Sequence, residues 1–171
     1  KGKEIVFDVK CTNLLAEIIT EAGGIPIMSP TGHFHIKNTI KKTNAPLAGE
    51  MSGHIFFNDA WYGFDDGHYS AFRLIEVIKN SASSLSKMFD QLPKAFSTPE
   101  LNINVNEEKK FKIVEDFVSQ SDFGEGKKIT IDGLRVNFDD GWGLLRASNT
   151  TPKLVLRFEA NSPERLNEIQ N

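Results

Sequence analysis

Residues 4–28 read EIVFDVKCTNLLAEIITEAGGIPIM, and this stretch decides the fold of the first part of the chain. Residues 4–9 form a short apolar run that is rich in β-formers. Thr12 or the next residue can cap a helix, and the glycine pair 23–24 can end it. Residues 25–28 then indicate a second strand. Because a β-α-β order with buried strands packs helices on a sheet, we expect an α/β domain with a mixed sheet.

The following sequence predicts a loop up to residue 46, then two short strands and two helices. The strands cover 47–50 and 55–57, and Met51-Ser52-Gly53-His54 separates them. The helices cover 69–79 and 85–92. Helical spacing places these side chains on inward faces: Phe72, Ile75, Ile78 or Val77 in the first helix, and Leu85, Met88, Phe89 and Leu92 in the second.

A change of composition marks the boundary between two domains. The helical pattern stops at residue 92, and residues 93–102 contain two prolines together with Ser97 and Thr98. We therefore expect a first domain at residues 1–92, a linker at 93–99 and a second domain at 100–171.

The second domain is predicted to be a small α+β domain with an antiparallel sheet. An amphipathic helix is expected at 107–120, and Ser162 with Pro163 begins a last helix. Asp132-Gly133 and Asp140-Gly141 are hairpin turn signals, because glycine adopts a positive φ at little cost. The expected strands are 129–131, 134–138, 144–147 and 154–158.

Composition argues against two classes of partner. The 171 residues are 39% hydrophobic and 25% charged, with a net charge of −3, as in ordinary globular proteins. Lysine and arginine are scattered, which argues against nucleic acid. No apolar run approaches the roughly 18 residues that span a bilayer, which argues against a membrane. The single Cys11 excludes an internal disulfide and fits a reducing, cytoplasmic compartment.

Two polar loops carry the candidate chemistry. In Gly49-Glu50-Met51-Ser52-Gly53-His54, a carboxylate and a hydroxyl can bond neighbouring sugar hydroxyls, and the glycines allow close approach of a ligand. The alternative is a capped turn between strands. In Arg146-Ala147-Ser148-Asn149-Thr150-Thr151-Pro152, a planar guanidinium and neutral donors suit a phosphate. The alternative is a polar hairpin loop with an exposed arginine.

Five segments of the chain, taken in order, resemble one family. They are Ile5-Val6-Phe7-Asp8-Val9-Lys10-Cys11, Thr31-Gly32-His33, Gly49-Glu50-Met51-Ser52-Gly53-His54, Trp61-Tyr62-Gly63-Phe64-Asp65-Asp66-Gly67 and Arg146-Ala147-Ser148-Asn149-Thr150-Thr151-Pro152. Together they resemble the bacterial phosphomannomutase/phosphoglucomutase branch of the α-D-phosphohexomutase superfamily, across its third and fourth domains. The related phosphoglucosamine mutases usually have Gln in place of Met51 and Gly in place of Asn149, so the hexose-phosphate branch is favoured.

The resemblance implies a role for each candidate site residue. Glu50 and Ser52 would bind sugar hydroxyls, and His54 would support the loop or the ligand. Lys10 and His33 would lie in the cleft, where they bind phosphate or assist proton transfer. The phosphate that is not being transferred would be held by Arg146, Ser148, Asn149 and Thr150.

The resemblance also implies parts that these residues lack. The family transfers phosphoryl from a phosphoserine in its first domain, uses Mg²⁺ held by an Asp-rich loop in its second, and needs an activating sugar bisphosphate. Neither motif occurs here, so we expect this chain alone to be inactive and the missing N-terminal domains to be its partners.

No metal site is predicted within the chain itself. His33 and His35 have no further ligands at useful spacing. Turn chemistry explains Asp65-Asp66-Gly67 and Asp139-Asp140-Gly141.

Three functions remain open at this point. The first is the C-terminal part of a mutase that interconverts the 1- and 6-phosphates of mannose or glucose through a bisphosphorylated sugar. The second is a stand-alone, non-catalytic module that binds sugar phosphates. The third is a scaffold with degenerate loops, and the intact Arg146, Glu50 and Ser52 weigh against it.

Overall fold

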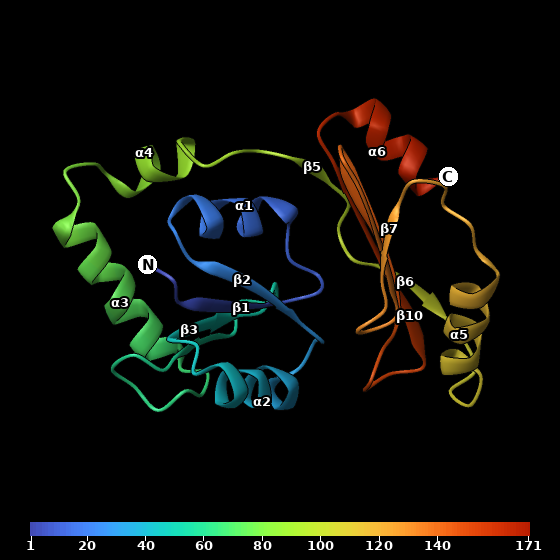
Figure 1. Cartoon of the computed structure of the whole chain (residues 1–171), viewed down its shortest axis with the longest axis horizontal. Helices are drawn as coiled ribbons and strands as arrows, with labels where there is room; N and C mark the ends of the chain where they lie inside the picture. The colour runs from blue at the N-terminus through green and yellow to red at the C-terminus, as the bar shows by residue number, and fades with distance from the viewer. The chain divides into compact units, whose positions relative to one another are not determined.

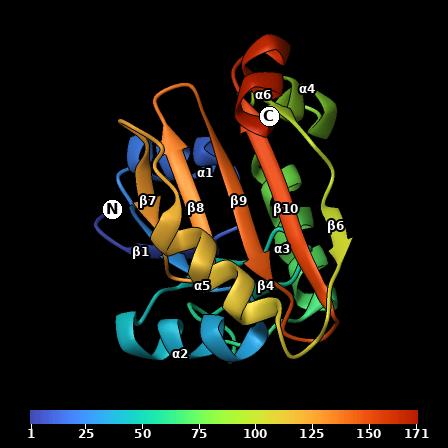
Figure 2. The same cartoon turned by 90° about the vertical axis from the view of Figure 1, so that its right-hand side faces the viewer.

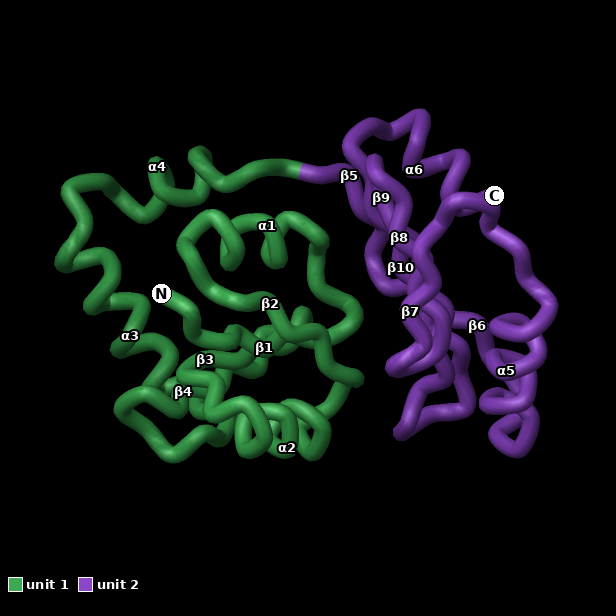
Figure 3. The backbone as a smooth tube through the Cα atoms, viewed as in Figure 1, with its two compact units in different colours: residues 1–94 green, residues 95–171 purple.

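The computed structural model describes all 171 residues and divides into two compact units, Lys1–Lys94 and Ala95–Asn171 (Figure 3). The predicted linker at 93–99 contains a short strand as well as irregular chain. Phe96–Ser97 forms strand β5, which pairs with Glu159 and Ala160 at the end of strand β10 (Lys153–Ala160). The sheet of the second unit therefore begins inside the predicted linker.

The first unit is built on a four-stranded mixed sheet with the order β2-β1-β3-β4. The strands are β1 (Glu4–Asp8), β2 (Ile25–Ser29), β3 (Leu47–Gly49) and β4 (Ile55–Phe57). The first three are parallel, and β4 is antiparallel to β3. Helices α1 (Asn13–Glu21) and α2 (His33–Thr43) cover opposite faces of the sheet (Figure 1). The predicted α/β domain with a mixed sheet is confirmed.

Each face of this sheet has its own core, because successive strand residues point to opposite sides. Val6 packs with Ile36 and Ile40 of α2, whereas its neighbour Phe7 packs with Ile19 of α1. Each helix thereby fixes one side of the central strand β1.

Helix α2 occupies the segment that the sequence predicts to be a loop, so that prediction is wrong. Among its residues only Ile36 and Ile40 are buried, and its N-cap, Gly32, has no side chain to cap the helix. Asn44 in the left-handed conformation ends it. The helix therefore has only a sparse apolar pattern and lacks the capping side chain that identifies a helix in sequence.

Helices α3 (Gly67–Asn80) and α4 (Leu85–Asp90) differ from the prediction in the side chains they bury. Phe72 is 68% exposed, Ile75 58% and Phe89 62%. Val77 and Leu92 are exposed as well. The predicted inward faces are therefore wrong for these residues. On α3 a side chain that contacts β4 is Arg73, whose guanidinium lies over the ring of Phe57 at 4.4 Å.

The second unit is an α+β unit on an antiparallel sheet, as predicted. The order is β5-β10-β9-β8-β7, and β6 also pairs with β10 (Figure 2). Besides β5, the strands are β6 (Leu101–Asn104), β7 (Lys127–Ile129), β8 (Leu134–Phe138), β9 (Gly141–Ala147) and β10 (Lys153–Ala160). Helices α5 (Lys110–Gln120) and α6 (Pro163–Gln170) lie on one face of this sheet (Figure 1). None of the helices in the chain combines the length and apolar composition that crossing a membrane requires.

The face of this sheet opposite α5 and α6 carries polar side chains among apolar ones. The Arg135 guanidinium lies 3.7 Å from the centre of the Trp142 ring, and Trp142 Nε1 donates to Glu159 Oε1 at 2.9 Å. Residues 142, 144 and 146 of β9 share this face because side chains alternate along a strand. Arg146 is therefore directed away from the helices.

Candidate functional site

In the first unit, candidate residues follow the carboxyl ends of three parallel strands. Lys10 comes after β1, His33 after β2, and Glu50 after β3. Parallel strands bring their carboxyl ends to one edge of a sheet, which is where α/β proteins bind ligands. The turn with Ser52 and His54 leads from this edge into β4.

Asp8, the last residue of β1, ties these connections together. It is fully buried. Its Oδ1 accepts hydrogen bonds from Cys11 Sγ at 3.1 Å and from the backbone N–H of Met51 at 3.2 Å. Its Oδ2 accepts from Thr31 Oγ1 at 3.3 Å. Sequence reasoning assigned Asp8 no role, although a carboxylate at the end of a buried apolar strand is a usable signal.

The turn at Glu50 is fixed by backbone and side-chain bonds. The N–H of Gly53 donates to Glu50 O at 2.9 Å, and Gly53 adopts a φ of 92°. The Glu50 side chain is only 2% exposed, and its Oε1 accepts from the N–H of Gly32 at 2.6 Å. Ser52 and His54 are exposed. One carboxylate oxygen of Glu50 is thus committed to the start of α2.

His33, His54 and Asp65 form a cluster beside this turn. His33 Nδ1 lies 3.3 Å from Asp65 Oδ1, and His54 Nδ1 lies 3.0 Å from Asp65 Oδ2. One potential ligand atom from each residue lies within 4.8 Å of the others, a spacing that could hold a metal ion. The sequence pointed to His35 as the neighbour of His33, and Asp65 was assigned to a turn. Two imidazoles that share one carboxylate were not predicted.

Backbone bonds to β4 hold Asp65 in place. The segment after β4 folds back, so that Asp65 forms an antiparallel bridge with Phe56. On either side of the bridge, Gly63 N donates to Phe57 O at 2.9 Å, and Asp66 N donates to Ile55 O at 3.4 Å. The cluster therefore rests on the sheet.

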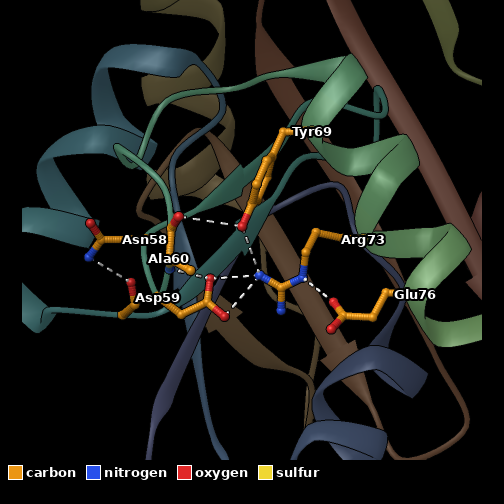
Figure 4. Close-up of polar contacts among 7 residues, drawn as sticks. Asn58, Asp59, Ala60, Tyr69, Arg73 and Glu76 are labelled. Atoms are coloured by element: carbon orange, nitrogen blue, oxygen red, sulfur yellow. Dashed lines mark hydrogen bonds and ion pairs between the residues drawn. The ribbon is translucent and has the colours of Figure 1, made fainter. Parts of the chain in front are cut away.

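Arg73 of α3 binds Asp59, near the start of the segment that follows β4 (Figure 4). Its Nη1 donates to Asp59 Oδ1 and Oδ2 at 2.8 and 2.9 Å. These bonds hold the pKa of Asp59 below its ordinary value and raise the pKa of Arg73. Trp61 stacks on Tyr69 with ring centres 4.5 Å apart. The segment is thereby fastened to α3 as well as to β4.

In the second unit, Asp132 orients Arg146. Arg146 Nε donates to Asp132 Oδ2 at 3.0 Å, and the side chains are 6% and 14% exposed. Gly133 makes this approach possible. It has a φ of +79°, and a Cβ there would lie 2.7 Å from Arg146 Cα. The bond uses Nε alone, so the terminal nitrogens Nη1 and Nη2 can serve a ligand.

The loop after β9 is organised by Ser148 and Lys110. Ser148 Oγ accepts from Thr150 N at 3.3 Å and from Thr151 N at 3.2 Å. Lys110, which is 1% exposed, donates from Nζ to Thr151 O at 3.1 Å. Asn149 and Thr150 are exposed at the tip of the loop. Ser148 is therefore engaged within the loop, and a ligand would meet the next two residues first.

Comparison with known proteins assigns each unit. Residues 1–96 match the family model for the alpha/beta/alpha domain III of phosphoglucomutase/phosphomannomutase, and residues 100–171 match its C-terminal domain. The two units thus correspond to consecutive domains of this family. The chain belongs to the phosphoglucomutase/phosphomannomutase family.

Individual relatives agree with this assignment. The chain is 52% identical over 169 residues to a phosphomannomutase/phosphoglucomutase of Pseudomonas syringae, and 51% identical over 172 residues to a phosphoglucomutase of Neisseria gonorrhoeae. A solved structure of a family protein from Burkholderia thailandensis matches with a TM-score of 0.91 at 48% identity. Each match covers 99% of this chain but only 36 or 37% of the relative. The chain thus spans little more than a third of the length of its relatives.

Proposed function

We propose that these residues are the C-terminal part of a phosphohexomutase that interconverts the 1- and 6-phosphates of mannose or glucose through a bisphosphorylated sugar. The family of both units and the names of the relatives support this reading. In this reading, the chain binds the sugar hydroxyls and the phosphate that is not being transferred.

The pair of Arg146 and Asp132 carries the phosphate part of the proposal. Because Asp132 fixes the guanidinium through Nε, little side-chain freedom remains to be lost when a ligand binds. Nη1 and Nη2 can then form two parallel bonds to phosphate oxygens. Asn149 and Thr150, exposed at the tip of the adjoining loop, would add neutral donors, and Ser148 would hold the loop in shape.

Glu50, Ser52 and His54 would bind the sugar hydroxyls. Carboxylate oxygens accept strong hydrogen bonds from hydroxyls and repel phosphate, which favours the neutral part of the substrate near Glu50. Lys10 and His33 would contact phosphate or assist proton transfer at this edge of the sheet.

Mg²⁺, a phosphoserine and an activating sugar bisphosphate belong to the proposal for the longer protein. The Asp-rich turns at Asp65-Asp66-Gly67 and Asp139-Asp140-Gly141 do not fit Mg²⁺, which prefers an octahedron of oxygen ligands. Asp66 caps α3, Asp140 pairs with Arg165, and Asp65 is accompanied by nitrogen ligands. We therefore propose that the chain alone has no mutase activity. A coupled assay that detects Mg²⁺-dependent conversion of glucose 1-phosphate by the purified chain would overturn this.

Calorimetry on the chain tests the assignment of the loops. Arg146→Ala should weaken binding of glucose 1-phosphate by about 1.5–3 kcal/mol, since it removes charge-assisted bonds. Glu50→Ala should leave binding of inorganic phosphate nearly unchanged. Arg165→Ala is the matched control, because Arg165 pairs with Asp140 and Glu168 away from the loop. Equal losses for Arg146→Ala and Arg165→Ala, or a loss of phosphate binding in Glu50→Ala, would contradict the assignment.

A further inference from the structure

We propose that Asp65 is a positioning residue that holds His33 and His54 in one tautomer, with Nδ1 protonated, so that both Nε2 atoms become hydrogen-bond acceptors. The inference deepens the proposed function, because it defines which part of a sugar phosphate this cluster can bind. The tautomers would be set by residues of this chain alone, without a bound ligand or metal.

The geometry of the cluster points to one shared carboxylate. Each Asp65 oxygen faces the Nδ1 atom of a different histidine, at 3.3 Å for His33 and 3.0 Å for His54. The two rings lie edge to face with centres 4.4 Å apart, and the His33 ring also contacts the edge of Phe56 at 5.8 Å. If the His54 ring turned over it would lose its hydrogen bond to Asp65, and if the His33 ring turned over it would lose its close approach of Nδ1 to the same carboxylate.

The tautomer follows from the chemistry of the partners. An ionised carboxylate has only acceptors, and a neutral imidazole has one N–H and one bare nitrogen. Nδ1 must therefore carry the proton in both histidines, and Nε2 is left as the acceptor. Glu50 Oε2 lies 3.9 Å from His33 Nε2, which is too long for a hydrogen bond. Glu50 therefore does not require a proton on Nε2 of His33.

The surrounding structure holds Asp65 firmly enough for its carboxylate to fix the tautomers of both histidines. Its backbone bridges to Phe56 of β4, which is fully buried. Arg73 and the stacked pair of Trp61 and Tyr69 fasten the preceding residues to α3. The carboxylate thus belongs to a fixed framework, whereas the imidazoles are 43% and 45% exposed and face solvent.

This arrangement selects a class of ligand. Two acceptor nitrogens beside the carboxylates of Asp65 and Glu50 form a surface that accepts protons and hydrogen bonds. A sugar hydroxyl, which donates, fits that surface, whereas a phosphate, which offers acceptors and negative charge, does not. The cluster would therefore contact a hydroxyl of the hexose. Of the two roles proposed for His33, this leaves proton transfer and not the phosphate contact.

A bound metal is the competing explanation for the same three side chains. Nitrogen and carboxylate ligands suit zinc, and the ligand atoms lie within 4.8 Å of one another. His54 Nδ1 is already hydrogen-bonded to Asp65 Oδ2 at 3.0 Å, and His33 Nδ1 lies 3.3 Å from the other carboxylate oxygen, so both nitrogens have a partner without an ion. The test below separates the two.

Long-range ¹H–¹⁵N spectra of the ¹⁵N-labelled chain, at a pH where imidazole is neutral, report the tautomer of each of its four histidines. We expect His33 and His54 to show a protonated Nδ1 and a bare Nε2. His35 and His68, which have no bond to Asp65, are internal references and should show the opposite, commoner tautomer. His33 and His54 spectra that match those of the references would overturn the proposal.

Two substitutions at adjacent positions sharpen the test. In Asp65→Asn, the amide offers one acceptor and one donor, so one histidine should keep its tautomer while the other reverses. Asp66→Asn is the matched control and should change neither, because Asp66 caps α3 instead. Reversal in both variants, or in neither, would contradict a specific role for Asp65.

Treatment with a chelator tests the metal. The spectra should be the same before and after dialysis against EDTA. Loss of the protonated Nδ1 signals when zinc is added at equimolar concentration, with recovery after EDTA, would show that the cluster is a metal site and overturn the proposal. Because no sugar is present, the outcome does not depend on the proposed function. Conversely, the chain could bind glucose 1-phosphate while His33 and His54 show the commoner tautomer, with Nε2 protonated. That result would contradict this inference and leave the proposed function standing.

Discussion

Asp8 Oδ1 accepts a hydrogen bond from the backbone N–H of Met51 at 3.2 Å, although 43 residues separate them in the sequence. The bond joins the end of the central strand to the turn that presents Glu50 and Ser52. The shape of this turn therefore depends on a buried carboxylate that belongs to another strand.

Asp8→Ala should destabilise the first unit. It would leave the backbone N–H of Met51 without its acceptor, and an unsatisfied buried group costs about 1–3 kcal/mol. Asp8→Asn retains one carbonyl acceptor and should cost less. Urea unfolding, followed through the backbone amides of the first unit, measures the free energy of unfolding of both variants. As a control, Asp116→Ala on exposed α5 should stay within about 0.5 kcal/mol of the parent. An equally small effect of Asp8→Ala would show that the carboxylate does not support the turn.

Gly133→Ala should destabilise the second unit by about 2–5 kcal/mol, since it adds a clash to a left-handed backbone. The new Cβ would lie 2.3 Å from Leu145 O. Gly124→Ala is the matched control, because Gly124 also has a positive φ but nothing lies within 4 Å of its Cβ position. It should lose only about 1–2 kcal/mol, the cost of the backbone conformation alone. Thermal unfolding compares the two, and equal losses would mean that Gly133 is not required for the close approach to Arg146.

Lys110→Met should loosen the loop at residues 148–152. Lys110 is almost fully buried and donates to Thr151 O, and a hydrogen bond to a charged group contributes about 1.5–3 kcal/mol. We expect faster amide exchange at Ser148 and Thr151, while α5 stays protected. Lys112→Met on the same helix removes only an exposed pair with Asp116 and should change neither. Unchanged exchange in Lys110→Met would exclude the proposed support.

The cap of α3 should weaken at acidic pH. The N–H of Tyr69 donates to Asp66 Oδ1 at 3.0 Å and holds the pKa of Asp66 below its ordinary value of 3.8. A carboxyl whose pKa is lowered by folding stabilises the folded state above its ordinary pKa, and this contribution is lost as the pH falls through the lowered value. The Tyr69 amide shift should therefore titrate with a midpoint below 3.8. A midpoint at or above that value, or the same titration in Asp66→Asn, would contradict the capping role.

Local sequence patterns were sufficient for the elements with regular signals. Thr12, one of the two predicted caps, caps α1, and β8 and β9 adjoin the Asp132-Gly133 and Asp140-Gly141 turns. Strands β5 and β6 were not predicted, and the strand predicted at 129–131 lies at Lys127–Ile129. Helix α2 escaped prediction because its apolar residues are sparse and its N-cap is a glycine. The inward face predicted for α3 is wrong for Phe72, Ile75 and Val77, and the contact of Arg73 with Phe57 and Asp59 is one that helical periodicity cannot reveal.

The candidate site was predictable where its residues are contiguous and not where tertiary contacts create it. The loops at Glu50 and Arg146 are visible in the sequence because their polar residues follow one another. Asp132 is 14 residues from the Arg146 that it orients, and Asp65 reaches His33 only because its segment folds back on β4. Asp-Asp-Gly and Asp-Gly sequences indicate turns, and that interpretation concealed the contacts that Asp65 and Asp132 make.

The central claim is that the loop at Glu50 binds sugar hydroxyls and the loop at Arg146 binds phosphate. A ¹H–¹⁵N titration of the 171-residue chain tests it most directly, with glucose 1-phosphate and inorganic phosphate added separately. The account predicts that glucose 1-phosphate shifts the amides of residues 50–54 and 148–151, whereas inorganic phosphate shifts only the second group. Shifts at residues 50–54 with inorganic phosphate, or no shift at residues 148–151 with either ligand at saturating concentration, would contradict it.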